Sequence, residues 1–431
     1  MRMVKLISFI SSFLLSLACF AQNEAWSGKI NIQGMELPLV FNFDSNACTF
    51  DSPSQGVKGI PAERSVDEDG TIKVGIKAIG AVFEGKMNGD SIRGTFTQNG
   101  YRFPLTLVAG GVTINRPQTP KPPFPYDVEN VRFTNDGYTF NGTLSLPKGY
   151  TDRTPVVLMV TGSGQQNRDE ELFDHHPFAI IADALARNGI ASLRYDDRGW
   201  NDKTVNFSDF VTNDFKSDAA AGLKFLRARF KKVGILGHSE GGSIALLLAS
   251  EGKTDFIVSL AGMAVSGKET LLMQNRQALS SVGLTDDMVN DYCNVLDKVL
   301  DDLANGKSLS EINTEKVPTL LRPMFEKSLQ LGDSKYIRSF VKVNPSQSLG
   351  KIKCPVLALN GTKDTQVDCA KNLGALEKGL TKCPHVIKQM PGLNHLFQHC
   401  TTGNVVEYQQ IEETISPEVL DVIVEWIGSL H

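Results

Sequence analysis

The sequence predicts an α/β protein with a doubly wound, mostly parallel sheet and a helical insertion, preceded by a small antiparallel β domain. Two observations predict this fold class. After about residue 127, short unbroken apolar runs alternate with helix-forming stretches, as in parallel strands that are buried on both faces. Residues 23–110 instead alternate apolar and polar side chains between turns such as 88–90 and 99–100. A chain of 431 residues is also too long for a single core.

The N-terminal part of the chain divides into three predicted segments. Residues 1–21 form a signal peptide, and residues 22–110 form the antiparallel β domain, a small sheet or partial barrel. Residues 111–126 contain five prolines, which predict a semi-rigid linker. The β domain is either a binding or substrate-gating module or a stabilising appendage, and the sequence leaves both interpretations open.

The second predicted domain comprises residues 127–431. It opens with a hairpin over residues 128–134 and 138–146, and buried strands alternate with helices after it. Residues 265–350 interrupt this alternation with helical periodicity and form the predicted insertion. The other expected elements are strands over 156–160, 191–195, 233–236, 256–261, 355–360 and 385–390 and helices over 178–188 and 214–229.

A strand, a turn and a helix at residues 237–242 carry the candidate nucleophile. The segment reads Gly-His-Ser-Glu-Gly-Gly, it follows the apolar run 233–236, and a helix-forming run follows it at 243–249. A sharp strand-to-helix turn strains the serine backbone and needs glycine on both sides. It also presents the hydroxyl at a helix N-terminus, whose partial positive charge favours a developing anion. We therefore predict Ser239 as a nucleophile, although an ordinary glycine-rich turn with a serine would read the same.

Two downstream loops contain the base and the acid that a serine hydroxyl needs for activation. Asp364 follows the apolar run 355–360, and His395 lies in the loop after the predicted strand 385–390. The order nucleophile, acid, histidine along the chain is the one that accompanies G-x-S-x-G turns of this kind. We therefore predict that Asp364 and His395 complete a catalytic triad with Ser239.

Each triad partner has a rival close by in the sequence. Asp368 competes with Asp364, but it is interpreted as the cap of a helix that begins near residue 369. His399 competes with His395, which the Pro-Gly-x-x-His spacing after the last strand favours. A turn aspartate and a surface histidine remain the ordinary alternatives for the predicted pair.

An oxyanion hole requires two backbone N–H groups near the nucleophile. One is expected from Glu240, the residue after the serine, and the other from the loop after the apolar run 156–160. That loop reads Thr-Gly-Ser-Gly over residues 161–164, and its glycines let the backbone approach a ligand closely. We predict the Ser163 N–H as the second donor, with Gly164 as the alternative. The loop matches neither a phosphate loop nor a dinucleotide fingerprint, so no cofactor is predicted.

With these motifs the chain resembles the α/β-hydrolase superfamily, from about residue 127 to the C-terminus. Four segments resemble those of a bacterial serine carboxylesterase subfamily whose members carry an extra N-terminal domain. They are residues 161–170, 194–199, 237–242 and 393–398. The resemblance implies an α/β-hydrolase fold, and the insertion at 265–350 then occupies the place of a lid over the site.

One loop departs from the pattern of that subfamily, and one N-terminal loop agrees with it. The subfamily often reads R-G-x-G-x-S after its fourth strand, whereas residues 199–203 read Gly-Trp-Asn-Asp-Lys here. Substrate contacts of relatives at that loop therefore do not carry over. Residues 55–61 resemble a loop of the extra domain in the subfamily.

The N-terminus predicts export. Two basic residues within the first five positions precede the apolar stretch 6–20, which is too short to span a bilayer. Small residues predict cleavage between Ala21 and Gln22, which leaves a periplasmic or secreted protein with no membrane span. Lipoprotein processing at Cys19 is the less favoured alternative, because no aliphatic residue stands three positions before the cysteine.

Composition excludes some partners and leaves the cysteines open. The formal net charge is −4, and the chain contains no basic block, so nucleic acid is not an expected partner. No C-x-x-C motif occurs, so neither a zinc site nor a redox-active motif is predicted. An exported protein permits disulfides, and the sequence offers two pairs, Cys354 with Cys383 and Cys369 with Cys400. The six cysteines beyond residue 21 are otherwise free thiols: Cys48, Cys293, Cys354, Cys369, Cys383 and Cys400.

The sequence thus predicts an exported serine hydrolase that cleaves a small-molecule carboxylic ester through an acyl-enzyme, without metal or organic cofactor. The alternatives are a serine peptidase or thioesterase of the same fold, and a binding protein with an inactive hydrolase domain. Fold alone does not fix substrate, so neither the acyl group, nor the alcohol, nor the oligomeric state follows from the sequence.

Overall fold

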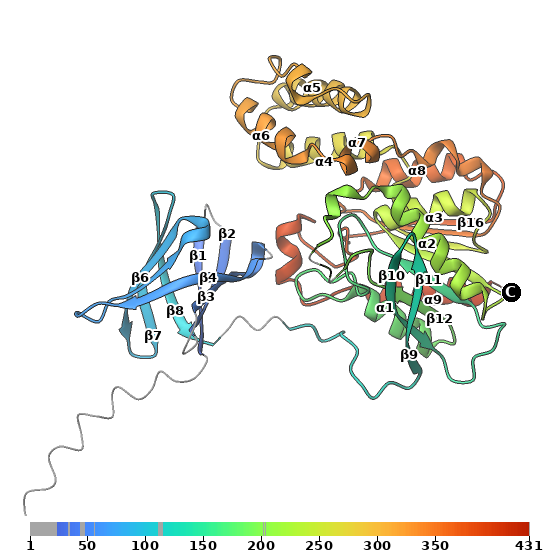
Figure 1. The fold of residues 1–431 in the computed structure, drawn as a ribbon, viewed down its shortest axis with the longest axis horizontal. Coiled ribbons are helices and arrows are strands. Elements are labelled where there is room, and N and C mark those ends of the chain that lie inside the picture. Colours follow the sequence, from blue (N-terminus) through green and yellow to red (C-terminus); the bar gives the residue numbers. More distant parts are fainter. Residues whose placement is uncertain are drawn as a thin grey trace, which may run out of the picture. The chain divides into compact units, whose positions relative to one another are not determined.

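The structure is a computed structural model that describes residues 24–32, 35–43, 48–55, 57–110, 115–200, 202 and 204–430. The chain forms two units, Met1–Asn115 and Arg116–His431 (Figure 1). Each unit has its own hydrophobic core. The predicted signal peptide lies outside the described residues. Among the residues that are described, no helix has the length and apolar character needed to cross a membrane.

The first unit is a closed antiparallel barrel, in which each of eight strands pairs with the next and β8 pairs with β1. The antiparallel β domain is therefore confirmed, and the sheet closes fully where the sequence suggested a partial barrel. The strands are β1 (Glu24–Ile32), β2 (Met35–Phe43), β3 (Cys48–Ser52), β4 (Val57–Val66), β5 (Ile72–Ile76), β6 (Ala81–Asn88), β7 (Ser91–Gln98) and β8 (Tyr101–Ala109).

Alternation of side chains explains the barrel interior, and glycine explains its closure. Phe41, Phe50 and Phe83 point inward and are buried, and the ring of Phe41 lies 5.3 Å from each of the other two. Gly28 on β1 faces β8, where a Cβ atom would stand 2.2 Å from the carbonyl oxygen of Thr106. The two terminal strands can approach closely only because this side chain is missing.

The second unit contains an eight-stranded sheet in the order β16-β15-β14-β13-β11-β12-β10-β9. The strands from β16 to β12 run parallel, whereas β9 and β10 pair antiparallel at one edge. The predicted doubly wound, mostly parallel sheet is confirmed. The strands are β9 (Asp127–Asn135), β10 (Tyr138–Leu146), β11 (Val156–Val160), β12 (Ala191–Tyr195), β13 (Val233–His238), β14 (Ile257–Leu260), β15 (Val356–Gly361) and β16 (His385–Met390).

Helices cover both faces of this sheet and form a separate hydrophobic core on each. Leu158 of β11 packs into one core and its neighbours Val157 and Met159 into the other, because successive strand residues face opposite sides. Helices α2 (Thr212–Arg227), α3 (Glu240–Ser250) and α8 (Cys369–Gly379) belong to the first core. Helices α1 (Pro177–Arg187) and α9 (Pro417–Ser429) belong to the second.

The helical insertion lies between β14 and β15 and has a small core of its own (Figure 1). It comprises α4 (Gly267–Ser281), α5 (Asp286–Ala304), α6 (Arg322–Gly332) and α7 (Lys335–Phe340). Tyr292 on α5 and Phe325 on α6 pack edge to face at 4.9 Å. The short 3-10 helices of the second unit are Phe207–Asp209, Leu309–Glu311, Pro345–Gln347, Leu349–Lys351 and Val405–Gln410; those of the barrel are Pro53–Gln55 and Lys77–Ile79.

Residues 116–126, which we call the strap, fall within the interval predicted as a linker and pack on the second unit. The Arg116 guanidinium donates hydrogen bonds to the carbonyl oxygens of Phe173, Gln409 and Ile411. The strap is therefore fastened to loops that lie far apart in the sequence. Proline content predicts a stiff segment but not where its other side chains bind.

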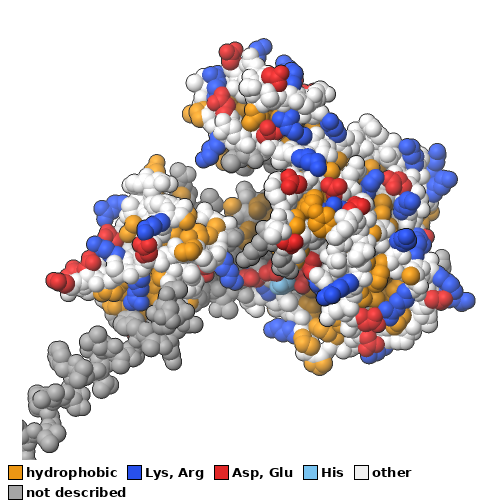
Figure 2. Space-filling view, viewed as in Figure 1, with side chains coloured by type: hydrophobic (Ala, Val, Ile, Leu, Met, Phe, Trp, Pro, Cys, Tyr) orange, Lys and Arg blue, Asp and Glu red, His pale blue; other side chains and the backbone are white. Residues whose placement is uncertain are grey.

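The described surface carries charges of both signs, and the described cysteines are free thiols. Lysine and arginine side chains alternate with acidic ones over the face shown in Figure 2. The six described cysteines are free thiols, so neither proposed disulfide is formed in this structure. Within the described residues, no group of three or more histidine, cysteine or acidic side chains could hold a metal ion.

Candidate active site

Ser239 lies in a sharp turn between β13 and α3, where the central strand ends. Its backbone has φ 53° and ψ −117°, a conformation that costs a non-glycine residue about 1–3 kcal/mol. Flanking glycines make the turn possible. A Cβ atom on Gly237 would stand 2.1 Å from the Gly241 carbonyl oxygen, and one on Gly241 would stand 2.1 Å from that of Val160. The turn therefore presents the serine side chain at the first turn of α3.

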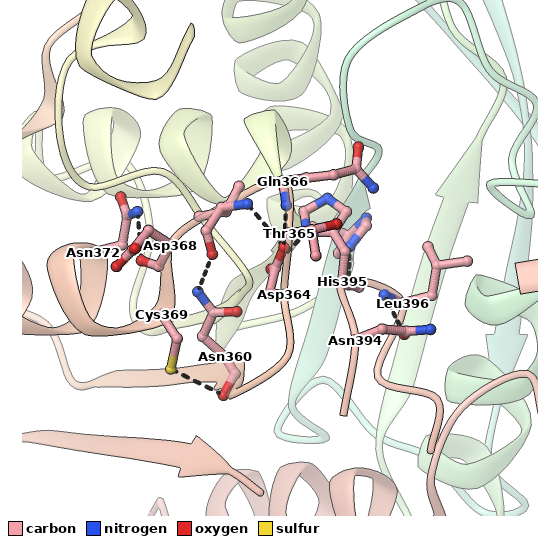
Figure 3. Close-up of polar contacts among 12 residues, drawn as sticks. Asn360, Asp364, Thr365, Gln366, Asp368, Cys369, Asn372, Asn394, His395 and Leu396 are labelled. Atoms are coloured by element: carbon pink, nitrogen blue, oxygen red, sulfur yellow. Dashed lines mark hydrogen bonds and ion pairs between the residues drawn. The ribbon is translucent and has the colours of Figure 1, made fainter. Parts of the chain in front are cut away.

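Asp364 and His395 come from the loops after β15 and β16 and meet in a buried pair (Figure 3). Asp364 Oδ2 lies 2.7 Å from His395 Nδ1. Asp364 Oδ1 accepts hydrogen bonds from the N–H groups of Gln366 and Val367, each at 2.8 Å. The backbone of its own turn thus fixes the Asp364 carboxylate, and the carboxylate fixes the orientation of the His395 imidazole.

The two rival residues serve other purposes. Asp368 caps α8, because its carboxylate accepts a hydrogen bond from the Lys371 N–H at 2.8 Å. The His399 side chain is 58% exposed and pairs with Glu413 at 2.9 Å. The carboxylate of Asp368 and the ring of His399 therefore bond to residues other than Asp364 and His395.

The loop that carries His395 lies against His238, the residue before Ser239. The His395 ring lies 4.6 Å from the ring of His238, the residue before the serine. Among the contacts of the described residues, no hydrogen bond joins Ser239 Oγ to His395. Such bonds are often long in an enzyme without substrate and shorten in the complex, so this geometry does not exclude a serine–histidine pair.

The loop after β11 lies directly against the serine. A Cβ atom on Gly162 would stand 3.2 Å from Ser239 Cβ, so the residue directly before Ser163 is beside the turn. The other predicted donor, the N–H of Glu240, is at the first position of α3, where a helix has no intrahelical acceptor for it. The two backbone segments that sequence analysis singled out are therefore adjacent.

A buried glutamate that sequence analysis did not single out connects these parts. Glu170 Oε1 accepts a hydrogen bond from the Gly162 N–H at 2.7 Å and lies 2.9 Å from His238 Nδ1. His238 Nε2 lies 3.0 Å from the backbone carbonyl oxygen of His395. One carboxylate thus links the loop after β11, the residue before Ser239 and the loop that carries His395.

The Glu170 carboxylate also changes the protonation of His238. Burial alone lowers the pKa of His238, but the charge and hydrogen bond of Glu170, together with the His395 carbonyl and the Asp364 charge, outweigh burial and raise the pKa above its ordinary value. A protonated His238 donates from both ring nitrogens, which suits its two acceptors. The one local signal for this role is the charged run Arg-Asp-Glu at 168–170 in a loop that was already expected beside the site.

The insertion contacts the residue after the nucleophile. The Glu240 carboxylate is buried and accepts hydrogen bonds from the Tyr336 hydroxyl of α7 and from the Thr212 hydroxyl of α2, the latter at 2.6 Å. Burial and the neighbouring Glu240 raise the pKa of Tyr336, so the phenol stays protonated and can donate. The position of α7 is therefore tied to the start of α3.

The comparison with protein families identifies the second unit. A family described as alpha/beta hydrolase fold matches residues 155–399, which run from just before β11 to the loop after β16. The chain belongs to the α/β-hydrolase fold family. The resemblance seen in the sequence is therefore confirmed, and the strand-turn-helix that contains Ser239 lies within the matched region.

Relatives of this α/β hydrolase include esterases. Esterase EstD from Thermotoga maritima is 26% identical over 307 residues, which cover 70% of this chain and 69% of that protein. Est1E from Butyrivibrio proteoclasticus is similar in structure, with 16% identity and a TM-score of 0.43 over 69% of this chain and 97% of that one. A dienelactone hydrolase from Anabaena variabilis has 17% sequence identity and a TM-score of 0.41, over 70% of this chain and 98% of that one. By sequence, the second unit is an esterase-like α/β hydrolase.

Proposed function

We propose that the protein is a serine hydrolase that cleaves carboxylic esters, with Ser239 as nucleophile, His395 as general base and Asp364 as orienting acid. The observation that carries the proposal is the buried hydrogen bond of 2.7 Å between Asp364 Oδ2 and His395 Nδ1. A carboxylate on Nδ1 fixes the tautomer that leaves Nε2 as acceptor, and it stabilises the imidazolium that forms in the reaction. The strained turn at Ser239 supports the assignment of the nucleophile.

The proposed reaction proceeds through an acyl-enzyme. His395 Nε2 takes the proton from Ser239 Oγ as the oxygen attacks the ester carbonyl carbon, and the carbonyl oxygen becomes an oxyanion. The N–H groups of Glu240 and Ser163 stabilise this charge, with Gly164 as the alternative to Ser163. The C–O bond of the ester then breaks, and the alcohol leaves with the proton from His395. Water repeats these steps on the acyl-enzyme and releases the acid.

The proposed substrate is a small-molecule carboxylic ester. The similarity to Esterase EstD supports this class over a peptide or a thioester, since the match covers 70% of the chain. The insertion at 265–350 is proposed as a lid, and the bond between Tyr336 and Glu240 supports a place for α7 beside the site. A lid that excludes water strengthens the electrostatic interactions of the reaction.

We also propose that the enzyme is exported. The basic start, the apolar stretch 6–20 and the small residues before Gln22 support cleavage between Ala21 and Gln22. Sequencing the N-terminus of the protein from a bacterial periplasm tests this. A mature chain that begins at Gln22 is expected, and a lipid-modified chain that begins at Cys19 would replace this proposal with lipoprotein anchoring.

The function is tested with p-nitrophenyl esters of graded acyl length, hydrolysed by the full chain and by Ser239→Ala. We expect turnover on at least one ester and loss of turnover in the variant, with an unchanged circular-dichroism spectrum. A fluorophosphonate probe should label the wild type and not the variant. A variant that keeps a substantial part of the activity would refute Ser239 as nucleophile. Labelling without ester turnover would redirect the assignment to a peptidase or a thioesterase.

A further inference from the structure

The hydroxyl of Tyr336 on α7 meets both residues of the proposed oxyanion hole. It donates a hydrogen bond to the carboxylate of Glu240. The side chain of Ser163 is a second hydrogen-bond partner, and this bond lowers the pKa of the phenol. Burial and the charge of Glu240 outweigh it, so the pKa of Tyr336 is raised and the phenol keeps its proton. One side chain of the insertion therefore lies where the start of α3 and the loop after β11 come together.

Packing holds the Tyr336 ring in place. The ring stacks on Phe340 of the same helix, with centroids 5.6 Å apart. Phe340 is buried in a cluster with Met263, which follows β14, and Val367, which follows β15, and Tyr336 packs against this cluster. Helix α7 is thus fastened to two loops of the hydrolase sheet, one of which carries Asp364, and the hydroxyl is preorganised at its position.

The Glu240 carboxylate needs such a partner, because it is a buried charge next to the place where a second charge develops. Glu240 is 2% exposed, and its own N–H is a proposed donor to the oxyanion. Its side-chain partners are two hydroxyl groups, Thr212 on Oε1 and Tyr336 on Oε2. In the part of the chain that the structure describes, no cationic side chain forms an ion pair with it. Like charges repel strongly where water is excluded, so a carboxylate without these donors would raise the energy of the oxyanion.

We propose that Tyr336 is a positioning residue of the reaction: its hydroxyl holds the Glu240 carboxylate in one orientation and disperses its charge, so that the oxyanion forms at lower cost. This role rests on the proposed serine-hydrolase function and adds a residue of the insertion to it. Tyr336 acts through Glu240 and Ser163 and is assigned no contact with the substrate. A lid that only excluded water would need no hydroxyl at this position.

The test is a double-mutant cycle of Tyr336→Phe and Glu240→Gln, measured on a p-nitrophenyl ester with active sites counted by fluorophosphonate titration. Tyr336→Phe removes one hydroxyl bonded to a charged group, so kcat per active site should fall about 10- to 100-fold with KM nearly constant. In the Glu240→Gln background no charge depends on the hydroxyl, and Tyr336→Phe should lower kcat about threefold or less. A residue that acted only through packing would cost the same factor in both backgrounds.

An oxyanion mimic gives a second readout, which decides if Glu240→Gln fails to fold. A trifluoromethyl ketone takes up Ser239 Oγ at its carbonyl carbon, the serine proton passes to His395, and the carbonyl oxygen becomes an oxyanion. Tyr336→Phe should weaken this inhibitor by about the factor that is lost in kcat, because both quantities depend on the oxyanion.

The matched control is Tyr292→Phe in the core of the insertion, whose hydroxyl donates to Asn275 at 3.3 Å. It should leave kcat and the affinity for the ketone unchanged, and an equal loss in this variant would overturn the role of Tyr336. If the fluorophosphonate labels an enzyme that hydrolyses no ester, the labelling rate replaces kcat in the cycle.

This proposal and the proposed function fail in different ways. A wild type that neither hydrolyses an ester nor reacts with the fluorophosphonate overturns both. With a reactive wild type, the positioning role alone is overturned by any one of three results. Tyr336→Phe keeps the wild-type kcat, or loses the same factor with Glu240 and with glutamine in its place, or binds the ketone as tightly as the wild type.

Discussion

Two buried carboxylate–imidazole pairs lie side by side in the α/β-hydrolase unit, and they differ in what the second ring nitrogen meets. The distance from carboxylate oxygen to Nδ1 is 2.7 Å between Asp364 and His395 and 2.9 Å between Glu170 and His238. The two imidazole rings are 4.6 Å apart. His238 Nε2 is bonded to the His395 carbonyl oxygen, whereas no residue in the described part of the chain bonds to His395 Nε2.

This difference separates the pair that we propose as reactive from the pair that we propose as positioning. A histidine can take a proton from a nucleophile only if one ring nitrogen is available for it. His395 meets this condition, whereas both nitrogens of His238 are already bonded within the protein. The same residue types therefore support opposite roles, and the roles follow from the partners of Nε2 rather than from the residue types.

The largest effect is expected from the reactive histidine. His395→Gln removes the proposed base and should lower kcat by roughly 10⁴- to 10⁶-fold, as the loss of a triad histidine does. Initial rates on p-nitrophenyl esters measure this, and circular dichroism checks the fold. The control is His399→Gln, an exposed residue bonded to Glu413, which should leave kcat unchanged. Comparable losses in both variants would contradict the assignment of His395.

The next effect separates the two acids near β15. Asp364→Asn keeps the shape of the side chain but no longer fixes the catalytic tautomer of His395, so kcat should fall about 10⁴-fold. Asp368→Ala removes only the cap of α8, and it should lower the free energy of unfolding by about 1 kcal/mol while kcat stays constant. Measuring kcat and the free energy of unfolding in denaturant for both variants tests which acid orients His395. A large kcat loss in Asp368→Ala would make that residue the orienting acid.

The positioning pair should give a smaller effect. Glu170→Gln keeps an acceptor for the Gly162 N–H but removes the charge that raises the pKa of His238. Burial is then opposed only by the Asp364 charge and the hydrogen bond to the His395 carbonyl, so the pKa of His238 should fall from its raised value. We expect kcat to fall about tenfold, the scale of one lost hydrogen bond to a charged group, with KM nearly constant.

The measurement for this variant combines kinetics with NMR titration of the histidine ring protons. A structural defect alone would lower the amount of folded enzyme without moving the His238 titration. A wild-type titration curve in Glu170→Gln would therefore refute the electrostatic link, whatever happens to the rate. Glu171→Gln, one position further along the chain and exposed, is the matched control.

Local sequence signals predicted the buried strands well. Segments bounded by turns gave β12 and β16 with the bounds that the structure has. β12 is an apolar strand buried between its neighbours in the sheet, whereas β16 is a largely exposed edge strand. Barrel closure was not predicted in full, since it depends on β1 meeting β8 at Gly28. Pairing between distant strands leaves no local pattern in the sequence.

The candidate site shows the same limit. The glycine-flanked turn around Ser239 is local, so the sequence could single it out. The role of Glu170 depends on three segments that only the fold brings together, and the charged run at 168–170 does not show which of its residues is buried. The strap illustrates it again, because five prolines predict stiffness but not that Arg116 binds three distant carbonyl groups.

A third histidine sharpens the comparison, because it is buried without a carboxylate. His175 Nδ1 lies 2.7 Å from the Thr414 hydroxyl and Nε2 lies 2.8 Å from the Tyr408 carbonyl oxygen. Burial lowers the pKa of His175 to about 4, opposite to the effect at His238. Because the folded pKa lies below the unfolded value of about 6.5, protonation favours the unfolded chain. The contribution of neutral His175 to folding stability is complete above about pH 6.5 and is lost as the pH falls toward 4.

The smallest predicted effect is therefore a slope of stability with pH. The Tm of the wild type should fall between pH 6.5 and about 4, and His175→Gln should reduce this slope because glutamine does not titrate in the window. The variant can be less stable throughout, so the slope and not the Tm at one pH decides. His399→Gln, at an exposed histidine, should keep the slope of the wild type. An equal slope in His175→Gln would show that other groups set the acid sensitivity of the protein. In that case the buried imidazole of His175, which lacks a carboxylate partner, would not differ from that of His238 in its effect on stability at low pH.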